Sequence, residues 1–181
     1  MRSVTRRQLL AGGAATLVLA GGSTVALAAA SGAFSTRSSC ATPHLSGTVV
    51  RVTDMDMGHM PTGMMGGQFG TMRVLAQPAT VRSGTVNLLA HNIGSRTHEL
   101  VVLPLAVGTS AGTRTPGADG RVDETGSLGE ASRTCGPGAG DGIKAGATGW
   151  VTLTLAPGRY ELVCNLKNHY ASGMFAELNV M

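Results

Sequence analysis

The stretch that decides the fold covers residues 150–180 and reads WVTLTLAPGRYELVCNLKNHYASGMFAELNV. Apolar and polar residues alternate over 150–155, as in an antiparallel strand with one buried face. Two further apolar runs, at 159–164 and 175–180, are bounded by Pro, Gly and Asn, which are typical of turns. The stretch therefore predicts three strands. Residues 156–159 (APGR) predict a tight turn that joins the first two strands as a hairpin.

Four more short apolar runs precede this stretch, at residues 47–53, 72–76, 85–92 and 99–105. Seven short strands separated by turn residues predict an all-β domain, built as a β-sandwich or barrel. The composition agrees, because 13% charged residues and 27 glycines argue against coiled coils and long helices.

A long stretch without apolar periodicity separates two of these runs. Residues 106–149 are rich in Gly, Thr, Ala and Asp. Loops of this length are uncommon in compact domains and tend to be functional or partly disordered. We expect a long loop here.

The N-terminal region has the layout of an export signal. Arg6 and Arg7 precede an apolar run that ends in small residues near position 30, which resembles a twin-arginine signal peptide over residues 1–30. Residues 31–45 then form a linker to a domain at 46–181. The alternative is an uncleaved membrane anchor, since about 20 apolar residues can span a bilayer. Either way we expect the domain in the periplasm or at the outer face of the cytoplasmic membrane.

The net charge of +4 does not indicate a nucleic-acid partner. Without Arg2, Arg6 and Arg7, 11 basic residues face 10 acidic ones, a net charge of +1. A nearly neutral domain lacks the basic surface that phosphate binding requires.

The three cysteines divide into a pair and a single residue. Exported proteins usually pair spare cysteines, and Cys40 and Cys135 are the two left over if Cys164 has another role. We predict a Cys40–Cys135 disulfide, with two free thiols as the alternative.

The predicted loop between the last two strands carries three soft or borderline metal ligands. Cys164 ends a strand, His169 follows five positions later, and Met174 follows five positions after that. A mononuclear type 1 copper site needs two imidazoles and one thiolate in a plane, with a weak axial thioether. His98, at the start of an apolar run, supplies the second imidazole.

The spacing C-x4-H-x4-M resembles the ligand loop of cupredoxins of the rusticyanin and sulfocyanin type. This resemblance implies a Greek-key β-sandwich and one type 1 (blue) copper ion held by His98, Cys164, His169 and Met174. It also implies that His169 lies nearest solvent, within an apolar patch of Leu166, Tyr170 and Ala171. Family members often carry Asn or Ser after the first ligand histidine, and Glu99 departs from that pattern.

The single cysteine in this loop favours one copper chemistry over others. Position 168 is Asn168, which excludes the binuclear centre that carries a second cysteine there. With one domain, five histidines and no H-x-H pair, the chain lacks the further ligands of copper enzymes. We therefore expect an electron carrier rather than an enzyme, a monomer whose redox partner is a cytochrome or a membrane oxidase.

A methionine-rich segment is the second candidate copper site. Thioethers are soft ligands that favour Cu(I), so the segment suggests a labile site and, as an alternative function, a copper-binding chaperone or store. A flexible apolar docking loop is the other interpretation. His44 and His91 have weaker claims, and His91 is expected at the surface. The segment's candidate ligands are Met55, Met57, His59, Met60, Met64 and Met65.

Overall fold

The structure is a computed structural model that describes residues 40–41, 43–56 and 72–181. The predicted signal peptide and most of the methionine-rich segment lie outside these residues. The chain divides into two units, Met1–Ser35 and Thr36–Met181, and the described residues belong to the second. Within the described ranges, no helix combines the length and the hydropathy that crossing a membrane requires.

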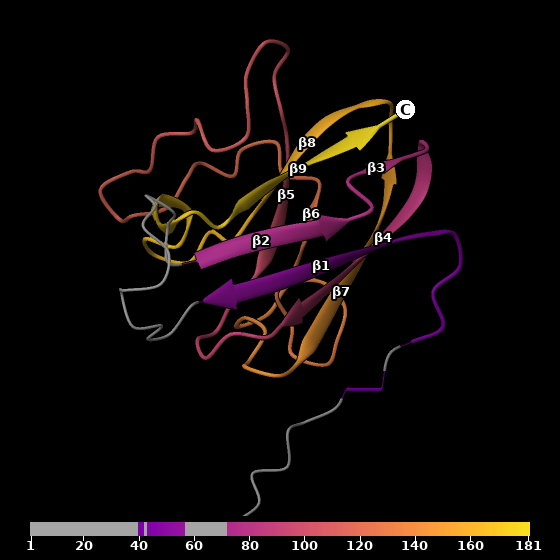
Figure 1. Ribbon diagram of the computed structural model, residues 1–181, viewed down its shortest axis with the longest axis horizontal. Helices are drawn as coiled ribbons and strands as arrows, with labels where there is room; N and C mark the ends of the chain where they lie inside the picture. The colour runs from indigo at the N-terminus through magenta and orange to yellow at the C-terminus, as the bar shows by residue number, and fades with distance from the viewer. Residues whose placement is uncertain (1–39, 42, 57–71) are drawn as a thin grey trace, which may run out of the picture. The chain divides into compact units, whose positions relative to one another are not determined.

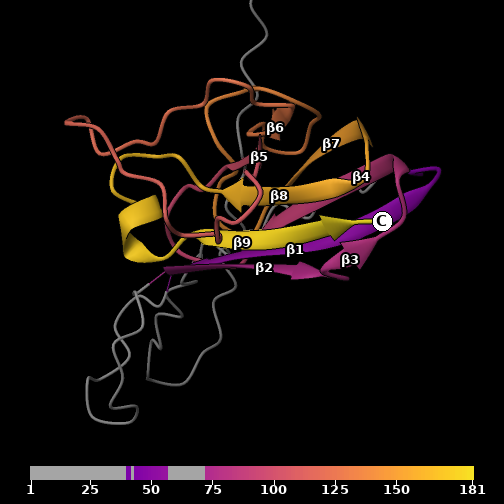
Figure 2. The same cartoon turned by 90° about the horizontal axis from the view of Figure 1, so that it is seen from above.

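Two mixed sheets pack face to face, which confirms the all-β sandwich (Figure 1, Figure 2). One sheet has the strand order β2-β1-β4-β7, and the other has the order β3-β9-β8-β5-β6. The strands are β1 (Thr48–Asp56), β2 (Met72–Gln77), β3 (Thr80–Val81), β4 (Gly84–Asn92), β5 (Leu100–Pro104), β6 (Gly129–Ala131), β7 (Thr148–Leu155), β8 (Gly158–Val163) and β9 (Phe175–Val180).

The core lies between the sheets and follows the alternation in the sequence. Val50 and Val52 of β1 face inward, while Arg51 between them is exposed. Leu88 of β4 and Leu162 of β8 are fully buried in the same apolar cluster. At about 25 cal/mol per Å² of apolar surface, such side chains supply most of the driving force for folding.

The predicted hairpin between residues 150–155 and 159–164 is wrong. β7 pairs with β4, whereas β8 pairs with β5 and β9 in the other sheet. The turn thus carries the chain across the sandwich, and Tyr160 Oη donates a hydrogen bond to the Ala156 carbonyl oxygen (2.8 Å). Such a tyrosine corner is typical of connections between the sheets of a Greek-key sandwich. Turn residues fix the reversal of the chain, but which strand pairs with which depends on the packing of the whole core.

The stretch 106–149 is more structured than the sequence suggests. It contains β6, which pairs with β5. Val122 and Ile143 are buried, and Ile143 forms a β-bridge with His98. These apolar residues are too widely spaced to give a periodic pattern, so only their tertiary contacts reveal the order.

The predicted disulfide is present between Cys40 and Cys135, which are 95 positions apart. It ties the start of the domain to the 106–149 stretch. Cys164 is a buried free cysteine.

Candidate metal centre

Two connections at one end of the sandwich bring the candidate ligands together. The connection from β4 to β5 carries His98, and the connection from β8 to β9, residues 164–174, carries Cys164, His169 and Met174. β5 pairs with β8, with Val101 opposite Val163. This register places His98 beside Cys164.

The ligand atoms of three residues converge on one point. The Cys164 sulfur lies 3.3 Å from His169 Nδ1 and 3.9 Å from His98 Nδ1, and the two Nδ1 atoms are 3.3 Å apart. Three ligands in a plane at about 2.0–2.3 Å from a metal ion lie about 3.5–4 Å apart. The cluster therefore has the dimensions of a metal site. It is also the one group of at least three His, Cys, Asp or Glu residues at metal-binding separations in the described part of the chain.

The main chain brings Met174 to the same place. The Cys164 amide donates to the Met174 carbonyl oxygen (3.1 Å), and the Met174 amide donates to the His169 carbonyl oxygen (3.2 Å). The Met174 side chain is fully buried and belongs to the same core cluster as Cys164. With its thioether nearby, the four residues have the donor set of a type 1 copper site.

Local sequence explains the tight shape of the 164–174 connection. Asn168 has a φ of 66°, a left-handed conformation that Asn tolerates better than most residues. A short 3₁₀ helix, η1 (Tyr170–Ser172), follows His169 and ends at Gly173, whose φ is 101°. These two residues allow the tight turns that bring the chain from β8 back to the antiparallel β9.

The surroundings of Cys164 suit a metal-bound thiolate. Burial raises the pKa of the thiol to about 12, although the backbone amides of Glu99 and Leu166 oppose this shift. The Glu99 amide lies 3.3 Å from the sulfur. A thiol with this pKa ionises at neutral pH only when a metal displaces its proton.

Burial favours the neutral form of both imidazoles, which is the form that a metal requires. Burial lowers the pKa of His98 and of His169. His98 is fully buried, whereas His169 is 9% exposed. His169 is thus the ligand nearest solvent, as the cupredoxin resemblance implies.

Asp56, which the sequence analysis did not single out, holds the far side of the His98 ring. Its Oδ1 lies 3.2 Å from His98 Nε2. Burial opposes ionisation of Asp56, but hydrogen bonds from Ser95, His98 and Arg96 outweigh burial and lower its pKa to about 2. The alternation of buried residues along β1 points to an inward Asp56, but only the tertiary structure identifies His98 as its partner.

Glu99 acts on Cys164 in two ways, because its backbone amide lowers the pKa of the thiol and the charge of its carboxyl raises it. Its side chain is 7% exposed, and burial, followed by the negative charges of Glu130 and Glu124, raises its pKa to about 7. Its amide nevertheless donates to the thiol. The departure from Asn or Ser at this position leaves the backbone link between the two ligand-bearing segments intact.

The N-terminal part of the long stretch, residues 106–128, covers the 164–174 connection. Asn165 receives a hydrogen bond from the Val122 amide (2.7 Å) and donates to the Val122 carbonyl oxygen (2.9 Å). The Asn168 amide donates to the Gly120 carbonyl oxygen (2.8 Å). Figure 2 shows this segment beside η1 at the end of the sandwich. We call residues 106–128 the covering segment.

The covering segment corrects one expectation about the surface near His169. Tyr170 is 3% exposed, and its hydroxyl donates to Glu161 Oε1 (2.8 Å) and accepts from the Arg114 amide (3.0 Å). Tyr170 is therefore a buried anchor and not part of an exposed apolar patch. Leu166 is partly buried and Ala171 is exposed.

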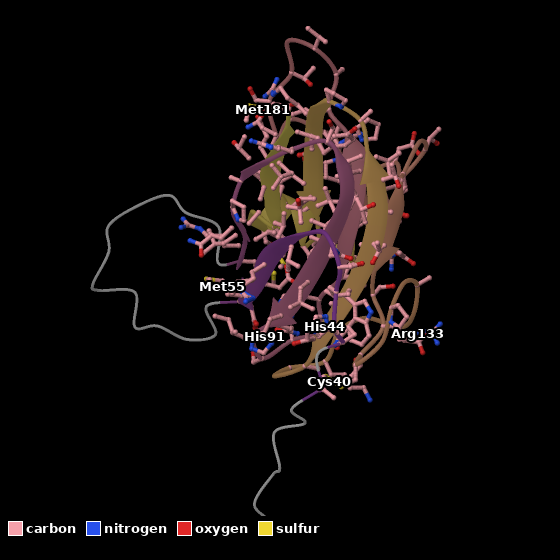
Figure 3. All side chains as sticks on the ribbon, turned by 90° about the vertical axis from the view of Figure 1, so that its right-hand side faces the viewer. Cys40, His44, Met55, His91, Arg133 and Met181 are labelled. Atoms are coloured by element: carbon pink, nitrogen blue, oxygen red, sulfur yellow. A yellow bond between two sulfur atoms is a disulfide. The ribbon has the colours of Figure 1, made fainter. Side chains whose placement is uncertain are left out.

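Most of the second candidate copper site lies outside the residues that the structure describes. Met57, His59, Met60, Met64 and Met65 lie outside the described residues. Met55 lies in β1 opposite Arg73 of β2, and Figure 3 shows it at the margin of the sandwich. The labile site stays a prediction.

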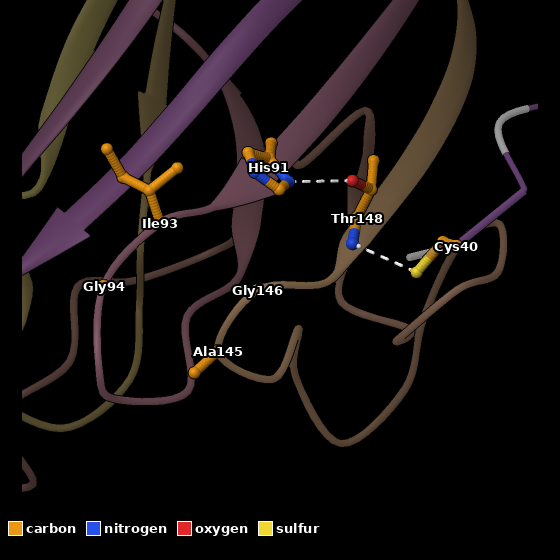
Figure 4. Close-up of a pocket in the computed structure, with 7 residues that line it drawn as sticks. All are labelled: Cys40, His91, Ile93, Gly94, Ala145, Gly146 and Thr148. Atoms are coloured by element: carbon orange, nitrogen blue, oxygen red, sulfur yellow. Dashed lines mark hydrogen bonds between the residues drawn. The ribbon is translucent and has the colours of Figure 1, made fainter. Parts of the chain in front are cut away.

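His44 and His91 do not belong to the cluster of candidate ligands. His91 is exposed, and its Nδ1 lies 3.0 Å from Thr148 Oγ1, in an open pocket of about 570 Å³ (Figure 4). The one sulfur lining that pocket, that of Cys40, belongs to the disulfide. The pocket therefore offers a single imidazole and no thiolate, and His91 is a surface residue as predicted. Figure 3 shows His44 and His91 at the end of the molecule opposite Met181.

The comparisons with known proteins find similar structures but no similar sequence. No family model and no curated protein matches the chain. One similar solved structure is reduced auracyanin from Roseiflexus castenholzii, with 18% sequence identity over 75% of this chain and 98% of that chain and a TM-score of 0.45. Another is auracyanin B, with 20% identity over 77% of this chain and 93% of that chain and a TM-score of 0.45. A third is rusticyanin from Thiobacillus ferrooxidans, with 23% identity over 75% of this chain and 79% of that chain and a TM-score of 0.39. At these identities and TM-scores, the likeness assigns neither a ligand nor an activity to this chain.

Proposed function

We propose that this protein is an exported type 1 copper protein that binds one copper ion and carries single electrons between redox partners. The observation that carries the proposal is the convergence of one buried thiol and two neutral imidazoles, with a buried methionine beside them. Bound copper would supply a one-electron couple that no side chain of the cluster supplies alone.

Each residue of the site has a distinct task in this proposal. Cys164 would give the thiolate, the strongest and most covalent donor, and His98 and His169 would give the two imidazole nitrogens. Met174 would give a weak thioether donor, which favours Cu(I) and raises the potential. The sandwich and the covering segment hold these groups in one arrangement, so a change of oxidation state requires little movement.

The surface around His169 is the proposed exit for the electron. His169 is the most exposed of the four residues. Transient redox encounters use small interfaces, and the partner we expect is a cytochrome or a membrane oxidase. The Cys40–Cys135 disulfide is consistent with an oxidising compartment such as the periplasm.

Addition of Cu(II) to the purified protein tests the proposal. We expect an intense blue or green colour from the thiolate-to-copper transition, with one copper bound per chain. Cys164→Ser should abolish the colour, while Cys40→Ser/Cys135→Ser should keep it, because those sulfurs lie outside the site. A wild-type protein that stays colourless would overturn the proposal.

A further inference from the structure

The residue that faces the remote nitrogen of His98 carries a negative charge. Asp56 is the last residue of β1, and its Oδ1 lies 3.2 Å from His98 Nε2. Its side chain is 4% exposed, and that of His98 is fully buried. Since His98 Nδ1 faces Cys164 and His169, Nε2 is the nitrogen left over to donate a hydrogen bond.

The carboxylate is fixed in place by three more donors. The Ser95 amide and hydroxyl donate to its two oxygens (2.5 and 2.6 Å), and the Arg96 amide donates to Oδ1 (3.3 Å). Gly94 makes this approach possible, because a Cβ at that position would overlap the carboxylate. Asp56 therefore binds the turn that leads into His98 as well as the His98 ring.

We propose that Asp56 is a positioning residue that selects the His98 tautomer and lowers the reduction potential of the bound metal. A hydrogen bond from Nε2–H to a carboxylate fixes the proton on Nε2 and leaves the Nδ1 lone pair free for the metal. It also makes the imidazole a stronger donor. A stronger donor beside a full negative charge stabilises the more highly charged Cu(II) more than Cu(I).

This inference rests on the proposed copper function, but its first test does not require copper. In the metal-free protein, ¹⁵N nuclear magnetic resonance of the histidine rings should find the neutral His98 ring protonated at Nε2. Protonation of the neutral ring at Nδ1 would overturn the inference. This readout needs no variant, so it remains available if a substitution at Asp56 prevents folding.

The second test compares Asp56→Asn with a matched control. Asn keeps the shape of Asp and an oxygen that can accept from Nε2, but it removes the charge. We expect the ratio of Cu(II) to Cu(I) affinity to fall about tenfold, the low end for loss of such a partner. The reduction potential should therefore rise by about 59 mV.

Asp123→Asn is the control, because Asp123 also accepts from the amide and hydroxyl of a nearby residue, Thr125, but does not contact a ligand. Its potential should stay at the wild-type value. An unchanged or lower potential in Asp56→Asn, or an equal rise in both variants, would overturn the role of Asp56. A wild-type protein that forms no coloured copper complex would instead refute the proposed function and leave the tautomer test standing.

Discussion

At the scale of single residues, substitution of Met174, a proposed ligand, separates the effect of its sulfur on the reduction potential from the effect of its apolar volume on packing. Met174→Gln should replace a soft axial sulfur with a harder amide oxygen, which favours Cu(II). We expect the potential to fall by about 59 mV or more, equivalent to at least a tenfold shift in relative affinity. Redox titration of the coloured wild-type and Met174→Gln proteins measures this difference in potential.

Met174→Leu is the matched control for this prediction. It keeps the apolar volume and should change the stability of the metal-free protein by less than about 1.5 kcal/mol. Its potential should not fall, since it introduces no oxygen donor. A fall of the same size in both variants would refute an axial role for Met174.

Asp54 is a buried acid that weakens the fold at high pH. It is 0% exposed, both of its oxygens lack a hydrogen-bond partner among the described residues, and burial raises its pKa to about 8. Below the unfolded pKa of 3.8 the carboxyl is protonated in both states and contributes no pH dependence. Between that value and about 8 the unfolded chain releases the proton more readily, so stability falls as the pH rises.

Asp54→Val should remove this loss of stability. Valine continues the apolar inner face of β1 formed by Val50 and Val52. We expect the advantage of the variant over wild type to grow by roughly 4 kcal/mol between pH 4 and pH 8, given about 1.4 kcal/mol per pKa unit. Urea unfolding of the metal-free proteins measures it, and an advantage independent of pH would contradict the assignment.

At the scale of elements, an ion pair between the partly exposed Arg114 and the fully buried Glu161 attaches the covering segment to β8. Glu161 of β8 is fully buried, and it accepts from Arg114 Nε (2.7 Å), the Gly112 amide (2.6 Å) and the Tyr170 hydroxyl (2.8 Å). The covering segment, β8 and η1 thus meet at one carboxylate. This contact holds the 164–174 connection against the sandwich.

Arg114→Met should therefore lower the free energy of unfolding substantially. It leaves the buried Glu161 charge without its cation, and breaking a buried pair in this way costs about 3–5 kcal/mol. Arg159→Met is the control, because its pair with Glu177 is about one-third exposed and is worth less than about 1 kcal/mol. Unfolding free energies from urea titration should differ between the two variants, and equal losses would contradict the role of the buried contact.

At the scale of the whole molecule, the Cys40–Cys135 disulfide is the longest-range covalent constraint. It closes a loop of 95 positions. In the chain-entropy model, a loop of that length stabilises by up to about 4–5 kcal/mol. Cys40→Ser/Cys135→Ser should lose stability up to that amount, measured by urea unfolding of the metal-free protein.

Copper binding at the proposed site should be the same in wild type and in Cys40→Ser/Cys135→Ser, because Cys164 is not part of the disulfide. A reductant should lower the stability of wild type towards that of the double variant and leave the variant unchanged. If wild type and variant have equal stability, the disulfide contributes nothing to the fold.

Features carried by local pattern were predictable from the sequence. The alternation along residues 150–155 reflects the geometry of a strand with one buried face, and β7 lies there. The spacing of Cys164, His169 and Met174 specifies a connection of the right length, because all three lie on one loop. The Cys40–Cys135 pair is the one that remains when Cys164 is assigned to the ligand loop of a chain whose N-terminal segment predicts export.

Features that join distant segments required the tertiary structure. Asp56 and His98 are 42 positions apart, and Val122 and Asn165 are 43 apart. The assignment of β7 and β8 to different sheets depends on which packing buries the apolar side chains of each strand. The sequence by itself determined seven of the nine strands that the structure describes, all except β3 and β6, and it predicted the candidate ligand loop, because backbone geometry and ligand spacing are local. Only the tertiary structure decided what surrounds the ligands, since those contacts form when the two sheets pack together.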